Sequence, residues 1–230
     1  MMRPLEGVRV LDFSTLLPGP MATLILAEAG ADVIKIERPG QGDEMRSYMP
    51  KFGDDSVNFA LLNRGKRSLA VNLKEAGIVD RLRGLIESAD IVVEQFRPGV
   101  MDRLGLGYDA LSKINPSIIY CAITGYGQSG PKADMAAHDL NYVADAGMLG
   151  LSMGSDGAPV LPPALIADIA GGTYPAVVNI LLALRQRDRT GKGCKLDIAM
   201  ADNLFTFLYW AIGNGQVAGR WPVPGGELGT

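Results

Sequence analysis

The 230-residue sequence contains little cysteine, a single histidine and no strong excess of charge. Its two cysteines, Cys121 and Cys194, lie far apart in apolar runs without a CxxC pair. Neither a disulfide framework nor a thiolate metal site is therefore expected, and a reducing cytoplasm is favoured. The formal net charge of −3 argues against a nucleic-acid partner, since phosphate backbones select for clustered surplus Lys and Arg.

Long apolar runs are also missing, and the start of the sequence does not resemble a leader segment. The uninterrupted apolar segments are shorter than the ~18 residues that span a bilayer. The start, MMRPLEGVRVLDF, lacks the apolar core and small-residue cleavage site of a signal peptide. We therefore expect a soluble cytoplasmic protein without a membrane partner, and the 47% of apolar residues can supply the core of one large domain.

Short β-branched runs alternate with helical stretches, which is the pattern that builds parallel sheets through right-handed crossovers. A Pro-Gly-Pro turn at 18–20 opens a helix that ends at Gly30, between strands at 8–13 and 31–37. Further strands are expected at 67–73, 90–96, 117–123 and 194–200, with a helix at 75–88. The prediction is an α/β fold with a doubly wound, mostly parallel, Rossmann-like sheet.

The last third of the chain predicts two helices and a tail. A long helix begins at Asp168 or Ile169 and carries basic residues near its end, where they complement the helix dipole. An aromatic-rich helix at 203–213 is followed by a Gly/Pro/Trp-rich segment at 216–230, which is typical of a linker. We expect residues 1–200 to form the large domain and residues 201–230 to form a helix and linker.

The βαβ start invites comparison with dinucleotide-binding proteins, but the glycine fingerprint is absent. Glu37 ends the second strand where an acidic residue would hold a ribose, whereas the stretch from Ser14 to Pro20 contains only Gly19 in place of G-x-G-x-x-G. A bound NAD is therefore not expected. Arg38 and Arg97 follow the carboxyl ends of predicted parallel strands, where open α/β sheets bind ligands, and arginines there can hold phosphates. The alternative is that both are solvated loop charges.

Two side chains are candidates for acid–base chemistry. His138, the only histidine, begins the predicted helix HDLNYVADAGML and titrates near neutral pH, yet a lone imidazole can equally fill a hydrogen-bonded niche. Asp168 precedes an apolar periodic run, which is also typical of a helix N-cap. The residues alone leave these alternatives open. Asp139, Asp145 and Asp202 are interpreted as cap or surface carboxylates.

Six ordered segments carry a resemblance to a known family. They are PLEGVRVLDFSTLLPGP, LAEAGADVIKIERPGQGD, NRGKRSLAVNLK, FRPGVMDRLGLGYDAL, INPSIIYCAITGYGQSGP and LIADIAGG. Over nearly the whole chain they resemble the family III CoA-transferases of the CaiB/BaiF type and their relatives, the α-methylacyl-CoA racemases. HDLNY, thirty residues before Asp168, resembles the racemase branch, because the transferases usually carry a different aromatic-Asp motif there.

The resemblance implies an acyl-CoA substrate, with His138 and Asp168 as catalytic residues. It also implies that the substrate, chiefly its CoA moiety, is bound by Thr15, Leu16, Arg38, Val71, Asn72, Leu73, Lys74, Gln95, Phe96, Arg97, Arg103 and Tyr142. Beyond that CoA moiety it implies no cofactor, neither a metal nor NAD. Members form interlocked homodimers and continue into a small second domain, before which this chain is expected to stop.

The resulting hypothesis is an acyl-CoA racemase that inverts the α-carbon of a 2-methylacyl-CoA by two-base proton transfer through an enolate. The first alternative is a family III CoA-transferase, in which Asp168 attacks the thioester as a nucleophile and passes through acyl and CoA-thioester intermediates. The second alternative is a CoA-binding fragment or split subunit without catalysis.

Overall fold

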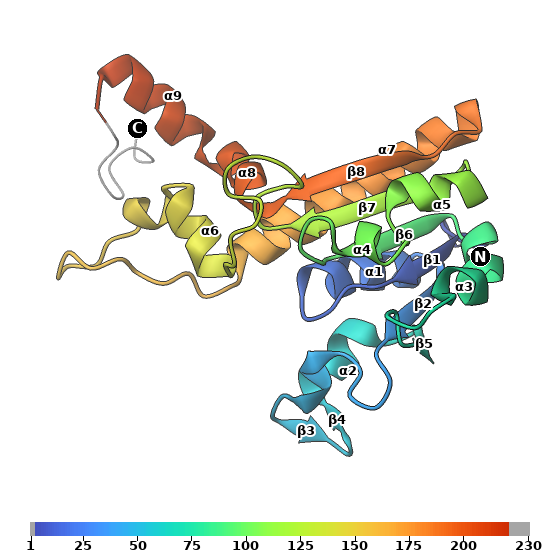
Figure 1. Cartoon of the computed structure of the whole chain (residues 1–230). Coiled ribbons are helices and arrows are strands. Elements are labelled where there is room, and N and C mark those ends of the chain that lie inside the picture. Colours follow the sequence, from blue (N-terminus) through green and yellow to red (C-terminus); the bar gives the residue numbers. More distant parts are fainter. Residues whose placement is uncertain (1–2, 221–230) are drawn as a thin grey trace.

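The computed structural model describes residues 3–220, and within them the centre is a six-stranded parallel sheet (Figure 1). Across the sheet, the strands are β5 (Arg67–Ala70), β2 (Asp32–Glu37), β1 (Arg9–Asp12), β6 (Ile91–Glu94), β7 (Ile119–Thr124) and β8 (Cys194–Ala199). Counted along the chain, this order is 3-2-1-4-5-6, which is that of doubly wound folds that bind ligands between the first and fourth strands. The predicted α/β fold with a Rossmann-like parallel sheet is confirmed.

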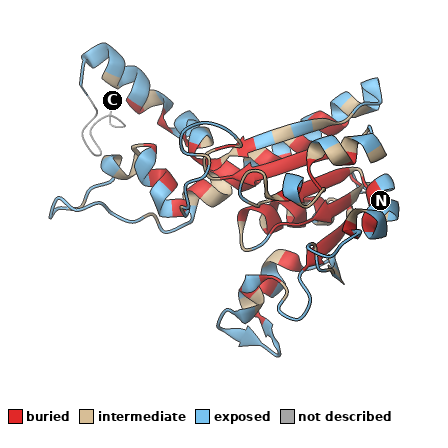
Figure 2. Cartoon of the chain, in the orientation of Figure 1, coloured by how far each residue is buried: buried red, intermediate tan, exposed pale blue. Residues whose placement is uncertain are grey.

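Helices cover both faces of this sheet. One face packs against α1 (Pro18–Glu28) and α7 (Tyr174–Thr190), and the other against α3 (Ile78–Glu87), α4 (Val100–Arg103) and α5 (Tyr108–Ile114). Because successive strand residues point to opposite faces, Val10 belongs to the first core and Leu11 to the second, both fully buried. Figure 2 shows the buried residues concentrated in the sheet and on the inner sides of these helices.

Smaller elements extend from the layered core (Figure 1). A hairpin of β3 (Lys51–Phe52) and β4 (Asp55–Ser56) leads into α2 (Val57–Asn63), after a 3-10 turn at Glu44–Ser47. Beyond the carboxyl ends of the strands lie α6 (Asp139–Asp145), α8 (Met200–Asn203) and α9 (Tyr209–Ala218), with 3-10 turns at Met148–Leu151 and Leu204–Leu208. The elements near α6 and α8 carry part of the site described below.

Several expected boundaries differ from the observed ones. The strand expected at 67–73 ends at Ala70, and the single helix expected at 203–213 is divided among α8, a 3-10 turn and α9. Helix α9 continues to Ala218, so the first residues of the expected linker at 216–230 are helical. The rest of that linker, from residue 221, lies outside the described residues, and the domain division at residue 200 stays a prediction.

The segment Ala167–Thr190 is long and apolar enough to cross a membrane by length and composition alone. Half of its most apolar window is buried inside the protein, because α7 packs Ala176, Val177 and Ile180 against the sheet. A buried core helix passes the same test, so this feature is only weak support for a membrane segment.

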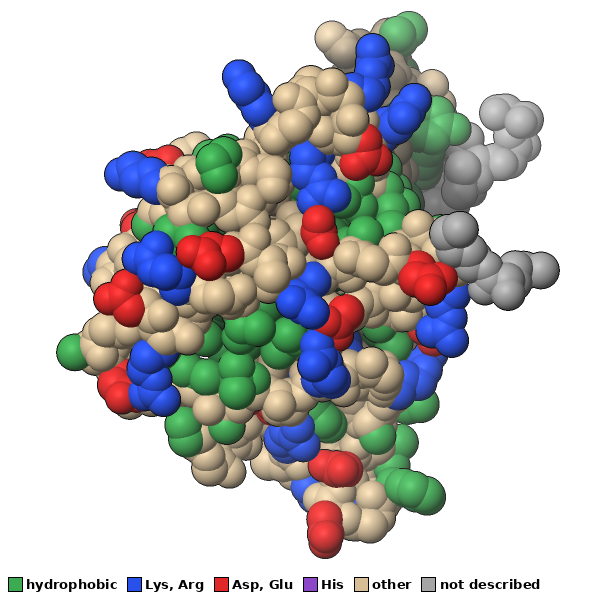
Figure 3. Space-filling model, turned by 90° about the vertical axis from the view of Figure 1, so that its right-hand side faces the viewer, with side chains coloured by type: hydrophobic (Ala, Val, Ile, Leu, Met, Phe, Trp, Pro, Cys, Tyr) green, Lys and Arg blue, Asp and Glu red, His purple; other side chains and the backbone are tan. Residues whose placement is uncertain are grey.

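Paired charges lie at the amino ends of the strands, on the side opposite the site. Asp32, at the start of β2, accepts hydrogen bonds from Arg9 and Arg67, and Arg187 of α7 pairs with Asp90 at 2.7 Å. Figure 3, which faces this side, shows basic and acidic side chains interspersed around apolar patches. The pairs of Asp32 with Arg9 and Arg67 are partly exposed and contribute little to stability individually. They make this face an unsuitable place for a single anionic ligand.

Candidate functional site

A cavity of about 390 Å³ lies at the carboxyl ends of the strands, where the sheet order reverses between β1 and β6. We call it the His138 cavity. The loops after β1 and β6, the end of β7, the start of α6 and the turn before α7 all contribute to its wall. Among the residues singled out from the sequence, its lining includes Leu16, Gln95, Phe96, Arg97, His138, Tyr142 and Asp168.

A second cavity, of about 530 Å³, adjoins the first and is called here the Arg38 cavity. Of the residues singled out from the sequence, it is lined by Thr15, Arg38, Val71, Asn72, Leu73, Lys74 and Phe96. Because Phe96 lines both cavities, the two form neighbouring parts of one site. Arg103 lies in neither; it lines a smaller adjacent pocket of about 230 Å³ with Leu73 and Lys74.

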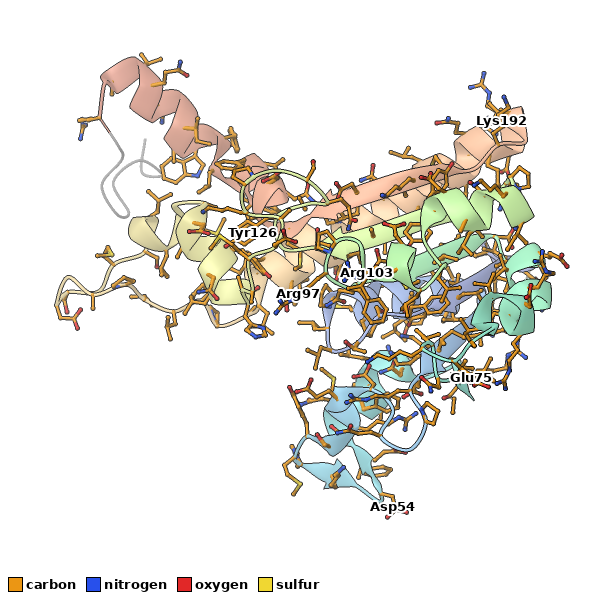
Figure 4. All side chains as sticks on the ribbon, viewed as in Figure 1. Asp54, Glu75, Arg97, Arg103, Tyr126 and Lys192 are labelled. Carbon is orange, nitrogen blue, oxygen red and sulfur yellow. The ribbon has the colours of Figure 1, made fainter. Side chains whose placement is uncertain are left out.

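The structure therefore brings the candidate residues to one edge of the sheet, although they come from segments far apart in the chain. Figure 4 shows Arg97 and Arg103 at this edge, with Arg97 between the sheet and the α6 region. Arg38 follows β2 directly and Arg97 follows β6 closely, as their positions after predicted strands indicated. The binding role of each residue stays a prediction.

The loop between β1 and α1 approaches the site without a glycine fingerprint. The Gln95 side chain accepts the backbone N–H of Gly19 at 3.0 Å, which joins the first turn of α1, directly after this loop, to the loop after β6. A Cβ at Gly19 would lie 2.2 Å from Cβ of Ser14, so only glycine fits there. Gly19, the single glycine between Ser14 and Pro20, thus serves close packing between two protein segments.

The peptide group that joins Ala137 to His138 is held by two hydrogen bonds. His138 is the residue immediately before α6, and the side-chain oxygen of Asn141 accepts its backbone N–H at 3.0 Å. The Tyr142 hydroxyl donates to the carbonyl of Ala137 at 2.7 Å, and its ring packs edge-on against Tyr126. The exposed imidazole thus extends from a fixed backbone at the rim of the His138 cavity.

Asp168 does not cap a helix, so the N-cap interpretation is wrong. The segment Ala167–Thr173 is a π-helical turn that runs directly into α7, and Asp168 lies inside it. Its backbone N–H donates instead to the Asp139 carboxylate at 2.8 Å, across 29 residues of sequence. The Asp139 carboxylate, at the start of α6, thus binds a backbone N–H at the beginning of this turn. The Asp168 side chain is left free to line the His138 cavity.

Asp139 is therefore a site residue that sequence reasoning missed, because it was interpreted as a cap or surface carboxylate. It is 6% exposed, and its carboxylate also receives backbone N–H groups of Ile166 and Ala167. Burial raises its pKa, and those three hydrogen bonds partly oppose the rise. The only sequence signal was its position next to His138.

Burial and, to a lesser extent, the negative charge of Asp139 raise the pKa of the Asp168 carboxyl to about 6, while His138 acts in the opposite direction. Burial also raises the pKa of the neighbouring Tyr142 to about 12, with contributions from Asp168 and Asp139. A carboxyl that titrates near pH 6 can both accept and donate a proton under physiological conditions. Asp168 is thus suited to acid–base work.

Because the π-helical turn is closely packed, one added methyl group there should destabilise the folded protein. A Cβ at Gly171 would lie 2.3 Å from the backbone oxygen of Met200, which is a rigid neighbour. We expect Gly171→Ala to lower the free energy of unfolding by about 1–3 kcal/mol. Gly213→Ala in α9, where nothing lies within 4 Å, should instead be neutral or stabilising. Urea denaturation of both variants checks this, and equal stabilities would contradict it.

Glu37 is occupied by protein donors and is not open to a ribose. Arg46 binds both of its carboxylate oxygens at 2.8 Å, and Ser68 and the backbone N–H of Asp43 complete the set. Burial alone would raise the pKa of Glu37, but these donors outweigh it and hold the pKa at about 2. Next to it, the exposed Arg38 donates to the Gly42 carbonyl at 3.1 Å and lines the Arg38 cavity.

Within residues 3–220, no group of three or more His, Cys, Asp or Glu side chains is arranged to hold a metal ion. Both cysteines are free thiols, Cys121 buried in β7 and Cys194 at the start of β8.

Comparison with known proteins places this site in a family. The profile of CoA-transferase family III matches residues 5–229. The chain is 41% identical over 220 residues to an acetyl-CoA:oxalate CoA-transferase of Acetobacter aceti, covering 95% of this chain and 56% of that protein. It is 37% identical over 226 residues to the human α-methylacyl-CoA racemase, covering 97% and 54%. The chain thus spans about half the length of the curated relatives it matches.

A solved structure agrees with these matches. The crystal structure of a CaiB/BaiF family protein from Brucella suis superimposes with a TM-score of 0.91 at 35% sequence identity, covering 97% of this chain and 60% of that one. Transferases and racemases both occur among the relatives. Together with the profile match over nearly the whole sequence, these likenesses show that the chain belongs to CoA-transferase family III.

Proposed function

We propose that this protein is an acyl-CoA racemase, which interconverts the two enantiomers of a 2-methylacyl-CoA at the carbon next to the thioester. The observation that carries the proposal is that His138 and Asp168, an imidazole and a carboxyl of the kinds that act as general acids and bases, line the same cavity. Racemisation requires two such groups, because one proton leaves one face of the carbon and another arrives on the opposite face.

The proposed reaction has two proton transfers. In one direction the Asp168 carboxylate removes the α-proton, the electron pair of the C–H bond moves into the thioester to form an enolate, and protonated His138 delivers a proton to the other face. In the other direction neutral His138 removes the proton and protonated Asp168 returns one. After each turnover the proton has moved from one of the two groups to the other. Exchange with solvent then returns both groups to their starting protonation states.

The Arg38 cavity supports an acyl-CoA as the substrate. It combines the cations Arg38 and Lys74 with the apolar side chains Val71, Leu73 and Phe96, a combination that suits a nucleotide with phosphates. Phe96 then lies between the nucleotide and the reacting carbon, since it lines both cavities. We propose that the CoA moiety is the one carrier that the reaction needs, without a metal or NAD.

A pH profile tests the proposal, because the pKa of Asp168 lies at about 6. One direction needs ionised Asp168 with protonated His138, and the other needs protonated Asp168 with neutral His138. Both states carry one proton between the two groups, so the profiles of kcat/KM for the two enantiomers should coincide. Both should fall about tenfold per pH unit well below pH 6, where both groups are protonated. The measurement is deuterium uptake from D₂O for each enantiomer between pH 4.5 and 7.5.

The control for the pH profile is Asp168→Asn, which should remove the dependence near pH 6 from whatever exchange remains. The proposal would be contradicted by a kcat/KM that stays constant from pH 4.5 to 7.5 in the wild-type protein. Such a result would mean that Asp168 takes no part in the proton transfer.

A CoA-transferase is the second candidate, favoured by the transferases among the relatives and by the partly buried Asp168. In that reaction the Asp168 carboxylate attacks the thioester carbonyl and the C–S bond breaks. The CoA thiolate departs, and an acyl-aspartyl anhydride remains on the protein. The thiolate then attacks the aspartyl carbonyl, which releases the first carboxylic acid and leaves an aspartyl-CoA thioester for the acceptor carboxylate. These reaction steps do not require His138, so replacement of His138 distinguishes the two candidate functions.

The cytoplasmic location and the interlocked homodimer stay predictions. Large apolar side chains are exposed on α7 and in the α9 region, among them Tyr174, Leu182 and Tyr209. Their exposure supports the proposal that a second subunit covers these helices. The activity of the chain alone is likewise part of the proposal, since the relatives are nearly twice its length.

A further inference from the structure

Four charged side chains are buried beneath the loop that joins β1 to α1. Asp12 at the end of β1 lies opposite Lys35 of β2 in the sheet register, and Asp43 and Lys66 come from later loops. The side chains of all four are at most 2% exposed. Buried charges are costly and are often no more stabilising than apolar residues of the same size. Their presence here calls for a role other than stability.

These charges hold the loop by its backbone. Lys35 Nζ donates to the Ser14 carbonyl at 2.8 Å and lies 2.9 Å from Asp43 Oδ2. The other Asp43 oxygen accepts the backbone N–H of Leu16 at 3.2 Å. The N–H and hydroxyl of Ser14 both donate to Asp12, at 3.0 and 2.5 Å. The Lys35–Asp43 pair therefore fixes the loop at two points, one on each side of Thr15.

The held backbone has an unusual conformation. Leu16 has φ +61°, and within residues 3–220 it is the only non-glycine residue with positive φ. A branched side chain seldom adopts this conformation unless its surroundings impose it, and such residues gather at functional sites. Leu16 lines the His138 cavity, and the adjacent Thr15 lines the Arg38 cavity. The loop thus forms part of the wall between the two cavities.

We infer that Lys35 is a positioning residue, which acts through Asp43 and Ser14 to hold Thr15 and Leu16 between the two cavities. The kinetic consequence rests on the function proposed above. The CoA moiety is held in one cavity and the α-carbon reacts in the other, so the wall between them sets where that carbon lies relative to His138 and Asp168. A misplacement of about 1 Å can reduce a rate by about 10²-fold.

A simpler role for Lys35 predicts a different result. Lys35 and Asp43 also line the Arg38 cavity, so the ammonium group is near enough to serve as a direct ligand of the CoA phosphates. A direct ligand changes the affinity for free CoA and leaves kcat largely unaltered. A positioning residue lowers kcat and leaves the affinity for free CoA largely unaltered. The two roles therefore separate in one pair of measurements.

The main test uses the charge-neutral double variant Lys35→Met/Asp43→Asn, which leaves no unpaired buried charge. We expect hydrogen–deuterium exchange of the amides at 14–17 to rise at least about tenfold, while the core strands β6 and β7 stay protected. We expect kcat for α-proton exchange to fall by about 10–100-fold, with the Kd of free CoA within about threefold of wild type by calorimetry. The control is Arg83→Gln/Asp80→Asn, an exposed ion pair on α3, which should behave as wild type.

A second variant keeps the inference testable if the double variant does not fold. Leu16→Gly retains the Lys35–Asp43 pair and permits positive φ without strain, but it loosens the wall. We expect a roughly tenfold lower kcat with unaltered affinity for free CoA. Wild-type kcat in both variants, or a loss of CoA affinity at constant kcat in the double variant, overturns the inference. If the wild-type protein shows no α-proton exchange, the proposed function fails, and amide exchange at 14–17 alone decides the positioning role.

Discussion

Replacement of Asp168 by asparagine is expected to slow racemisation of a 2-methylacyl-CoA by about 10²–10⁴-fold. An amide of the same shape cannot accept or release the α-proton, so one face of the carbon loses its acid–base group. His138 remains, and it should still remove the proton of one enantiomer and return it to the same face. That enantiomer alone should therefore exchange its α-proton with D₂O without inversion, as followed by chiral chromatography and mass spectrometry.

The control for this variant is Asp188→Asn. Its carboxylate is 61% exposed and lies near the end of α7, remote from the cavity that contains Asp168. It should racemise at the wild-type rate. Wild-type racemisation by Asp168→Asn itself would remove Asp168 from the proposed mechanism.

His138→Gln is expected to reduce racemisation by a comparable factor of about 10²–10⁴, with the opposite stereochemical signature. Glutamine can make hydrogen bonds but does not titrate, so only Asp168 is left to move the proton. The enantiomer that continues to exchange should be the one that Asp168→Asn loses. The same chiral and mass analysis of both variants, side by side, reveals this reciprocal pattern.

The His138 variant also separates the two candidate functions. If the protein is a transferase with Asp168 as nucleophile, His138→Gln should still move CoA onto an added carboxylate, and Asp168→Asn should not. Full racemisation of both enantiomers by His138→Gln would contradict the two-base mechanism. The stability of each variant is checked by thermal unfolding, so that a loss of activity is not confused with a loss of fold.

The sheet was predictable because its strands are short and β-branched and are separated by helical stretches. "ADVIKIE" and "SIIYCAI" are short β-branched runs of this kind, and both lie in the central sheet as predicted. The hairpin of β3 and β4 was missed, since strands of two residues leave no alternation to detect. The π-helical turn was missed for a related reason: apolar periodicity reports a helix but not a local change in its hydrogen bonding.

The candidate site was predictable in part from position and in part only from resemblance. Arg38 and Arg97 follow predicted parallel strands, and the carboxyl ends of such strands meet at one edge, so their proximity followed from physical reasoning. The grouping of Val71 to Lys74 with them came from the resemblance alone. Asp139 and Lys35 were not identified, because their roles depend on contacts with residues 29 and 21 positions away in the chain.

Buried charge explains why those contacts are difficult to predict. A lysine within "VIKIE" is expected to reach solvent at an edge, whereas Lys35 lies in the second strand of the sheet and is 1% exposed. Its partners, Ser14 and Asp43, come from two different loops. Such an arrangement cannot be predicted from the neighbouring residues in the sequence, because its members come together only in the folded protein.

The most direct test is to incubate the protein, and in parallel any longer form of it, with one enantiomer of a 2-methylacyl-CoA in D₂O without an acceptor carboxylate. We expect one deuterium at the α-carbon, with loss of optical purity at a matching rate, because the proposed mechanism exchanges the proton as it inverts the carbon. Absence of deuterium, together with transfer of CoA to a carboxylate added afterwards, would contradict the racemase proposal and make Asp168 the nucleophile of a transferase.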